Sequence, residues 1–190
     1  MPLTKKERAL RKIASEVRRC KKCPLYKERT NAVPGEGPAN ARMFFVGEAP
    51  GKAEDEKGKP FVGSAGKILD EALEKAGLQR SKVFITSILR CRPPNNRNPK
   101  AGEMSACWPH LERYVDTISP RVLVALGRYG FKGLTGKTAR IGEMRNKKLE
   151  YKGIPIVATY HPAAVLYNRK LIKKIVYDFR KARRLSEQSA

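Results

Sequence analysis

The chain has 190 residues, with 41 Lys and Arg against 18 Asp and Glu, which gives a formal net charge of +23 at pH 7. This length suits a single α/β domain, and we expect residues 1–190 to form one. No apolar run approaches the roughly 20 residues of a membrane-spanning helix, and the basic amino-terminal segment lacks the apolar centre of a secretory signal. We therefore expect a cytoplasmic protein without membrane contact, whose positive charge serves a polyanionic partner such as nucleic acid.

Strand and helix patterns alternate along the chain. Thr4 and Glu7 have the spacing of a capping box and predict a basic helix that ends near Arg19. Further on, apolar runs predict strands, and apolar residues at helical period predict helices. The predicted strands span residues 42–48, 82–89, 121–127 and 154–162, and the later helices cover residues 68–76, 104–118 and 163–185.

This alternation is typical of βαβ units, so we expect an α/β fold with a parallel sheet covered by helices on both faces. In such folds the ligand site lies beyond the carboxyl ends of the strands. Three loops with chemically useful side chains leave predicted strands, at residues 47–66, 90–99 and 161–167. We expect these loops to converge on one site.

The four cysteines are candidates for one metal centre, because two structural disulfides are not expected in a reducing compartment. Cys107 by itself fits the apolar face of a helix. The close pair Cys20 and Cys23 and the loop residue Cys91 do not fit such a packing role. Zinc and a [4Fe–4S] cluster both accept four thiolates, and spacing does not decide between them.

The loop after the first predicted strand, GEAPGKAEDEKGKPFVGSAGK, is rich in glycine but does not match a phosphate-binding motif. It lacks the spacing of a dinucleotide fingerprint, and the Gly-Lys pairs at residues 58–59 and 66–67 are not followed by Ser or Thr as a P-loop requires. Its acidic residues also disfavour a triphosphate; among them, Asp55 and Glu56 are expected to be solvated charges. Backbone amides and a carboxylate beside Phe61 suit a flat, neutral ligand such as a nucleobase.

Several stretches together resemble the family 4 uracil-DNA glycosylases, the iron–sulfur type of archaea and thermophilic bacteria. They are GEAPGKAEDEKGKPFVGSAGKIL, ITSILRCRPPNNRNP, HPAAVLY and the four cysteines, and they cover nearly the whole chain. The resemblance implies a three-layer α/β/α fold around a short central parallel sheet of four strands. It also implies a [4Fe–4S] cluster on Cys20, Cys23, Cys91 and Cys107. The implied activity is that of a monofunctional hydrolase in prokaryotic base excision repair, associated with the nucleoid, which flips uracil out of DNA and cleaves its N-glycosidic bond.

The same resemblance implies roles for individual residues. Phe61 would stack on the flipped base. His161 would donate a hydrogen bond to uracil O2 and stabilise the negative charge that grows there as the bond breaks. Glu48 would orient the attacking water and oppose the positive charge on the sugar. The acidic residue in this glycine-rich loop would then serve to stabilise the cation that develops on the sugar, and not to bind a phosphate.

Other positions would bind the base or the DNA. Gly47 and Ala49 would allow close backbone approach, with the Ala49 amide available to a uracil oxygen. Glu54 matches a second acidic position of the motif. Leu166 is a candidate wedge for the space that the flipped base leaves, although a leucine there also suits a core position.

One residue departs from the family pattern. At the end of the second strand the family usually has Asn, which reads uracil O4 and N3–H together, whereas this chain has Ser87. A serine makes fewer simultaneous contacts, and losing such a contact commonly costs about 1–3 kcal/mol. We expect retained uracil excision with relaxed or reduced selectivity. A bound water, a slower enzyme, acceptance of hypoxanthine or xanthine, and a loss of function stay open as explanations.

Two other classes of function compete with this one. The chain would be a nucleic-acid-binding module with a structural metal site and no catalysis if it binds uracil-containing DNA without releasing the base. A nucleotide-dependent transferase would need a phosphate loop, which the sequence lacks. The expected partner is uracil-containing DNA, single- or double-stranded. A sliding clamp is a candidate protein partner although no clear clamp-binding motif is visible, and we expect a monomer.

Overall fold

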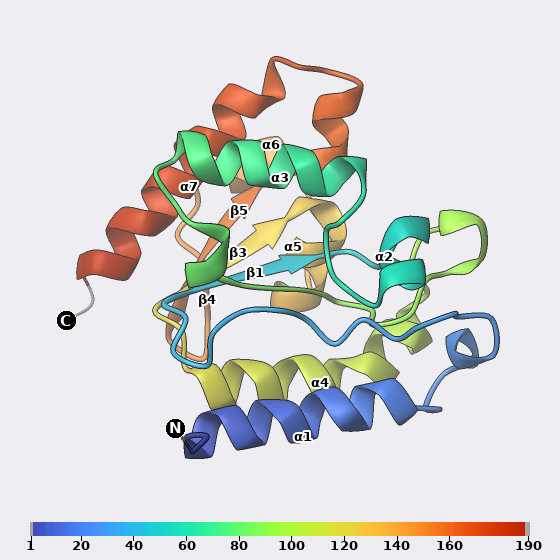
Figure 1. Ribbon diagram of the computed structural model, residues 1–190. Coiled ribbons are helices and arrows are strands. Elements are labelled where there is room, and N and C mark those ends of the chain that lie inside the picture. The colour runs from blue at the N-terminus through green and yellow to red at the C-terminus, as the bar shows by residue number, and fades with distance from the viewer. Residues whose placement is uncertain (1, 189–190) are drawn as a thin grey trace.

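The computed structural model describes residues 2–188 and is built on one five-stranded sheet (Figure 1). The strand order is β2-β1-β3-β5-β4, and the first four strands in this order are parallel. The predicted α/β fold with a parallel sheet is confirmed. The strands are β1 (Met43–Gly47), β2 (Phe84–Ser87), β3 (Val122–Leu126), β4 (Glu150–Tyr151) and β5 (Ile154–Thr159).

The sheet has one strand more than predicted. β4 pairs antiparallel with β5 at the edge of the sheet, with Glu150 opposite Pro155 and Tyr151 opposite Ile154. The two strands are joined by Lys152 and Gly153, whose φ angles are 51° and 76°. Positive φ at both positions is the geometry of a tight two-residue hairpin turn. A two-residue strand is too short to show an alternating pattern, which is why the sequence did not predict it.

Helices cover both faces of the sheet and make three layers, as Figure 1 shows. One face packs against α3 and α7, and the other packs against α1, α4 and α5. None of the described helices is long and apolar enough to span a membrane. The α-helices are α1 (Lys5–Arg19), α2 (Lys52–Lys57), α3 (Ser64–Lys75), α4 (Ala101–Ile118), α5 (Gly127–Thr135), α6 (Ile141–Met144) and α7 (Leu171–Gln188). The 3₁₀ turns are η1 (Pro24–Lys27), η2 (Arg80–Lys82), η3 (Pro94–Asn96) and η4 (Pro162–Leu166).

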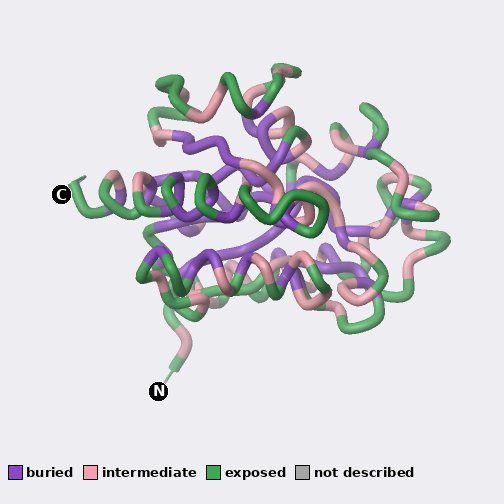
Figure 2. Tube along the Cα trace, turned by 90° about the horizontal axis from the view of Figure 1, so that it is seen from above, coloured by how far each residue is buried: buried purple, intermediate pink, exposed green. Residues whose placement is uncertain are grey.

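The strands are buried on both faces, which explains their nearly continuous apolar sequences. In β1, Phe44 and Val46 pack with the layer of α1 and α4, whereas Met43 and Phe45 pack with the layer of α3 and α7. Figure 2 shows the buried strands at the centre and exposed stretches on the outer sides of the helices. The short strands therefore hold the loops at their carboxyl ends on a rigid base.

The two ends of the chain test the helix predictions. At the start of α1, Glu7 N–H donates to Thr4 Oγ1 and Thr4 N–H donates to Glu7 Oε2, so the predicted capping box is confirmed. The final helix was predicted to begin at residue 163, but α7 begins at Leu171. The preceding residues form η4 and a turn in which the Asn168 side chain accepts from the Lys170 N–H, at 3.1 Å. A separate segment thus stands between His161 and α7.

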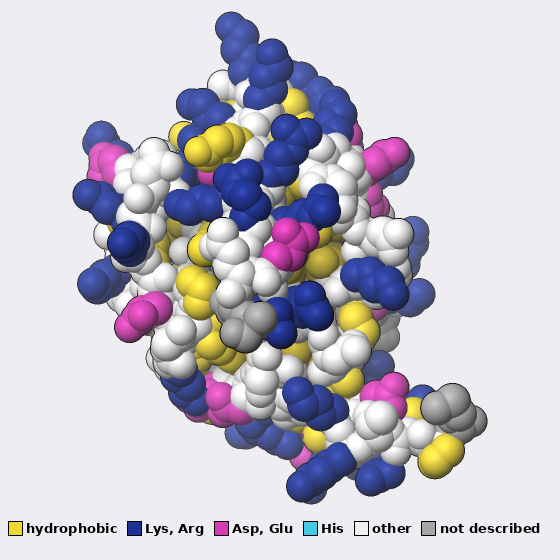
Figure 3. Space-filling view, turned by 90° about the vertical axis from the view of Figure 1, so that its left-hand side faces the viewer, with side chains coloured by type: hydrophobic (Ala, Val, Ile, Leu, Met, Phe, Trp, Pro, Cys, Tyr) yellow, Lys and Arg dark blue, Asp and Glu magenta, His cyan; other side chains and the backbone are white. Residues whose placement is uncertain are grey.

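Positive charge is spread widely over the molecule. Figure 3 shows the side opposite the arrowheads of β1 and β3 in Figure 1, and Lys and Arg side chains are scattered over it. A ligand site is expected at the other side, where the parallel strands end. Net charge alone therefore does not locate a nucleic-acid interface. The interface has to be identified from the side chains around a cavity.

Candidate active site

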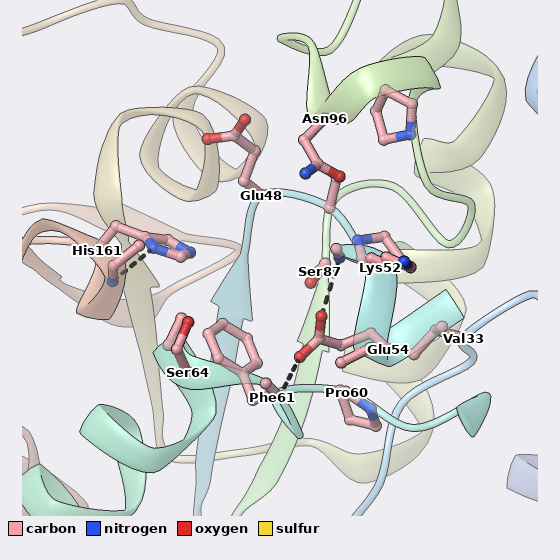
Figure 4. Close-up of a pocket in the computed structure, with 18 of the residues that line it drawn as sticks. Val33, Glu48, Lys52, Glu54, Pro60, Phe61, Ser64, Ser87, Asn96 and His161 are labelled. Carbon is pink, nitrogen blue, oxygen red and sulfur yellow. Dashed lines mark hydrogen bonds between the residues drawn. The ribbon is translucent and has the colours of Figure 1, made fainter. Parts of the chain in front are cut away.

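A cavity of about 460 Å³ lies at the carboxyl ends of the parallel strands. Its walls come from the loops that follow β1, β2 and β5, so the three loops converge as predicted. Figure 4 shows side chains from these loops around one open space. The cavity is lined by six of the seven residues that were predicted to cleave or bind the substrate: Glu48, Ala49, Glu54, Phe61, Ser87 and His161.

The seventh residue, Gly47, lies behind the aromatic wall. A Cβ atom placed on Gly47 would come within 2.7 Å of the Phe61 ring and 3.3 Å of Ser87 Oγ. The ring therefore rests directly against the backbone at the end of β1. Gly66 likewise lets the Phe61 backbone approach closely, since a Cβ on Gly66 would lie 2.0 Å from the Phe61 carbonyl oxygen. Glycine is required at both positions by close approach.

Phe61 and His161 form two aromatic walls of the cavity. Their ring centroids are 5.7 Å apart and the ring planes are inclined by 31°. Phe61 is buried and has a φ angle of 50°, a left-handed conformation that costs a non-glycine residue about 1–2 kcal/mol. Such a strained residue persists only where its surroundings hold it.

Glu54 helps to keep Phe61 in this left-handed conformation. Its carboxylate accepts three backbone hydrogen bonds, from Gly51 at 3.1 Å and from Val62 and Gly63 at 2.8 Å each. The carboxylate thus joins the start of α2 to the two residues that follow Phe61. We call these three hydrogen bonds the loop clamp. Both Glu54 oxygens are engaged by the backbone, so the geometry supports a positioning role for this residue.

The other acidic residues of the loop differ from one another. Glu56 is exposed, as predicted, and its carboxylate lies 3.9 Å from the Lys52 ammonium. Asp55 was predicted to be a solvated charge, which is wrong. It is buried and accepts hydrogen bonds from the backbone N–H groups of Thr30 and Asn31. Asp55 stands directly before the exposed Glu56 in the sequence, so nothing in the pattern signals its burial, and only the direction of α2 turns its side chain inward.

His161 has a defined tautomer. The backbone N–H of Ala163 donates to His161 Nδ1 at 3.2 Å, so Nδ1 is an acceptor and the proton of a neutral ring lies on Nε2. Burial lowers the pKa of His161 to about 4, against an opposing effect of Glu54. The ring is therefore neutral at pH 7 and offers an N–H donor. Gly127, with a φ of 75°, allows this packing, since a Cβ there would lie 2.7 Å from His161 Cβ.

Glu48 and Ser87 stand at the ends of β1 and β2. Burial raises the pKa of Glu48, and the Arg128 guanidinium opposes that rise. Among residues 2–188, none donates a hydrogen bond to the Glu48 carboxylate. Ser87 is buried and lines the same cavity, which is where the resemblance requires the base-reading residue.

Leu166 lies outside the cavity lining, at the end of η4. Its side chain is 51% exposed, so it does not belong to the core. The alternative that this leucine is a core residue is therefore wrong, and its role as a wedge stays a prediction.

The four cysteines lie together around a second, small cavity, as a single metal centre requires. Cys20 follows α1, Cys23 precedes η1, Cys91 follows β2 and Cys107 belongs to α4. Within residues 2–188, no three His, Cys, Asp or Glu side chains are grouped so as to hold one metal ion directly. Burial raises the pKa of Cys91 to about 11, and coordination by a metal deprotonates such a thiol.

Two arginines show that this cavity suits an anionic group. Arg90 lines it and is 1% exposed, yet within the described chain its Nε and Nη2 have no hydrogen-bond partner. Its Nη1 donates to the carbonyl oxygens of Ser87 and Ile88. Arg29 donates to Cys91 Sγ at 3.0 Å. A buried guanidinium without a carboxylate needs a compensating charge, and four metal-bound thiolates would supply it.

Sequence reasoning missed several lining residues. Val33, Lys52, Asn96 and Arg97 also face the cavity, but none of them was singled out. Asn96 and Arg97 lie in the second of the three predicted loops, so their position was a usable signal. Val33 comes from a segment before β1 that has no regular structure, and only the folded chain brings it to the site.

These features define an α/β protein with a base-sized cavity at the carboxyl edge of its sheet and a separate thiol-lined centre. The chain belongs to the uracil-DNA glycosylase superfamily: the family model described as "Uracil DNA glycosylase superfamily" matches residues 34–182. It is 48% identical over 187 residues to the type-4 uracil-DNA glycosylase of Sulfurisphaera tokodaii, covering 94% of this chain and 85% of that protein. The type-4 uracil-DNA glycosylase of Saccharolobus solfataricus is also 48% identical, over 90% of this chain and 83% of its own length. The type-4 uracil-DNA glycosylase of Thermotoga maritima is 38% identical, over 94% of this chain and 95% of its own length.

Proposed function

We propose that this chain is a monofunctional DNA glycosylase of base excision repair that hydrolyses the bond between uracil and deoxyribose in DNA. One observation carries the proposal: Phe61, His161 and Glu48 line a single cavity. An aromatic face, a neutral N–H donor and a carboxylate are the three groups that this reaction needs. A base inside a duplex is out of reach of such a cavity, so the nucleotide must be flipped into it.

His161 stabilises the departing base. As the N1–C1′ bond breaks, its electron pair moves to the base and negative charge grows on O2. The Nε2–H of a neutral imidazole donates a hydrogen bond to that oxygen, and the Ala163 N–H fixes the tautomer that makes this possible. A donor already in place when charge develops typically contributes about 10²–10³ in rate.

Glu48 acts on the opposite charge. Its carboxylate stabilises the cationic sugar and orients a water molecule for attack on C1′, and the water proton passes to this carboxylate or to solvent. Burial makes the carboxylate more basic, as the raised pKa shows, which suits acceptance of that proton. The role requires the ionised form.

Phe61, Gly47 and Ala49 form the base slot. Phe61 stacks on the uracil ring, Gly47 lets the phenyl ring lie against β1, and the Ala49 amide faces a uracil oxygen. The loop clamp of Glu54 holds Phe61 in its left-handed conformation. Glu54 thereby serves uracil binding through the loop.

Ser87 makes base selection less strict than an Asn would. The hydroxyl has one donor and two acceptor lone pairs on a single atom, and it cannot contact O4 and N3–H with the spread of an amide. Ser87 lines the cavity from the end of β2, where a base edge would arrive. We therefore propose excision of uracil together with slower excision of other deaminated bases such as hypoxanthine.

Cys20, Cys23, Cys91 and Cys107 would hold a [4Fe–4S] cluster, with zinc as the alternative. The support is the meeting of all four thiols at one cavity and the buried cationic Arg90 beside them. Such a group would join α1, β2 and α4 and compensate the guanidinium. Since Arg90 also donates to the Ser87 carbonyl, the group would steady the end of β2.

Uracil-containing DNA is the proposed partner, in the nucleoid of a prokaryotic cell, with Leu166 as the wedge behind the flipped nucleotide. The exposure of Leu166 supports that role. A sliding-clamp contact and a monomeric state stay predictions.

The test is release of uracil from a labelled oligonucleotide that contains one U, read as strand cleavage after alkali. We expect wild-type protein to leave an alkali-labile site at U, while Glu48→Gln and His161→Ala each lower the single-turnover rate by about 10²–10³. An oligonucleotide with T in place of U and the exposed-site variant Glu56→Gln are the controls. Tight binding of the U oligonucleotide without base release by wild-type protein would instead indicate a binding module.

A further inference from the structure

The segment between His161 and α7 carries an unusually exposed pair of apolar side chains. Leu166 is 51% exposed and Tyr167 is 93% exposed. Tyr177, 55% exposed, is the one further exposed large apolar residue in the described part of the chain. The pair follows His161 by five and six residues, in the segment at the top of Figure 1. The Tyr167 side chain buries almost no surface in the folded chain, so its burial adds little to the stability of the fold.

The backbone that presents this pair is well fixed. Tyr167 N–H and Asn168 N–H both donate to the Ala164 carbonyl, at 3.2 and 3.0 Å, and Ala164 N–H donates to the His161 carbonyl at 2.9 Å. Val165 is buried, at 2% exposure, in the core cluster of α3 and α7. Leu166 and Tyr167, which we call the apolar tip, are therefore preorganised on the same turn that positions His161.

Positive side chains follow the tip closely in the sequence. Arg169, Lys170, Lys173 and Lys174 follow within seven residues and are all exposed. Arg169 also reaches Glu71 of α3 at 2.5 Å, which ties the tip to that helix. An exposed aromatic ring followed by exposed cations, on the turn that carries His161, is chemistry that recognises a nucleic acid: bases stack on the ring and phosphates approach the cations.

We infer that Tyr167 is a stacking platform for a base that neighbours the flipped nucleotide. Leu166 fills the vacated space, and the adjacent Tyr167 ring covers the exposed face of the next base. Stacking needs one strand only, so the platform serves single-stranded as well as duplex DNA. The inference rests on the proposed function for the identity of the site, but binding through Tyr167 is measurable without catalysis.

The experiment measures binding of DNA that holds a tetrahydrofuran abasic analogue and no uracil, by fluorescence anisotropy, in single-stranded and duplex form. Tyr167→Ala should weaken binding by about 5- to 100-fold in both forms. Tyr167→Phe should stay within about twofold of wild type and Tyr167→Trp should bind at least as tightly, because the ring carries the effect. Tyr177→Ala, which removes an exposed tyrosine from α7, should bind like wild type.

Two further readouts separate stacking from charge. Tyr167→Ala should leave the slope of log K against log salt unchanged, whereas Lys170→Ala should reduce it by about 0.9 per lost phosphate contact. A 2-aminopurine next to the abasic analogue should be quenched by wild-type protein and not by Tyr167→Ala.

The inference is overturned if Tyr167→Ala binds within twofold of wild type, or if Tyr167→Phe is as weak as Tyr167→Ala. Because no substrate is cleaved, a protein that fails to excise uracil but loses binding in Tyr167→Ala would contradict the proposed function and keep this inference. Full uracil excision by wild-type protein with no effect of Tyr167→Ala on binding would do the reverse.

Discussion

Glu54→Gln tests whether the loop clamp controls the base slot. The carboxylate accepts from Gly51, Val62 and Gly63, while Arg80 Nη2 holds the Pro60 carbonyl at 2.7 Å. These contacts enclose Phe61 on both sides. Hydrogen bonds to a charged group are worth about 1.5–3 kcal/mol each, so the clamp outweighs the roughly 1–2 kcal/mol of left-handed strain at Phe61.

The size of the effect follows from the two oxygens of Glu54. A glutamine keeps an acceptor for Val62 and Gly63 at Oε1 but places an NH₂ group against the Gly51 N–H. One charge-assisted hydrogen bond is lost, at about 2 kcal/mol, and two become neutral, at about 1 kcal/mol each, so we expect a loss of about 4 kcal/mol. At about 2–4 °C per kcal/mol for a chain of this size, Tm should fall by about 8–16 °C.

Activity should fall as well. With the clamp weakened, the Phe61 ring is no longer held against β1, and a misplacement of about 1 Å costs up to roughly 10² in rate. Calorimetry and single-turnover excision from a uracil oligonucleotide are the assays. Glu56→Gln removes the same charge from an exposed position two residues away and should change stability by less than about 0.5 kcal/mol.

Two outcomes would refute this reasoning. Glu54→Gln with an unchanged Tm but a lost activity would mean that the carboxylate acts on the substrate itself, as its motif position suggested. A variant unchanged in both properties would mean that Phe61 keeps its conformation without the clamp.

Further predictions concern pH, selectivity and the thiol centre. Because burial raises the pKa of Glu48 above its usual value, excision should fall as pH falls through that pKa, before His161 protonates at about 4, and the residual activity of Glu48→Gln should lack this acid limb. The same burial makes the folded state bind the proton more tightly than the unfolded chain, so this carboxyl destabilises the fold above that pKa, and Glu48→Gln should have a higher Tm at pH 7. Ser87→Asn should raise the ratio of uracil to hypoxanthine excision by about 10- to 100-fold, and equal ratios in both proteins would contradict the role of Ser87. Cys91→Ser should lose the visible absorption and bound iron of an iron–sulfur protein, whereas stoichiometric zinc in colourless wild-type protein would contradict the cluster.

The fold and most of the candidate site were predictable because their signals are local. Apolar runs placed the four parallel strands, and the loops after them carried Glu48, Phe61 and His161 in recognisable surroundings. Four cysteines in one chain predicted that they meet, and the structure brings them to one cavity.

What could not be predicted depends on contacts between distant segments. Asp55 looks like its solvated neighbours, and only the backbone of residues 30–31 makes it a buried acceptor. The tautomer of His161 follows from the turn that places the Ala163 N–H against Nδ1. The burial of Arg90, whose Nε and Nη2 lack a hydrogen-bond partner within residues 2–188, is a property of the packed interior, since an arginine between Leu89 and Cys91 reads as an ordinary loop cation.

The close approach of the phenyl ring to Gly47 determines how thick a ligand the base slot can hold. A methyl group at this position would stand 2.7 Å from the ring, and ordinary contact begins at 3.4 Å, so the ring would have to advance by at least 0.7 Å. That advance is a sizeable part of the thickness of a heterocycle. The thickness of the slot is thus set by the hydrogen that Gly47 carries in place of a side chain, and one methyl group there would narrow the slot for purines and pyrimidines alike, because their rings are equally thick.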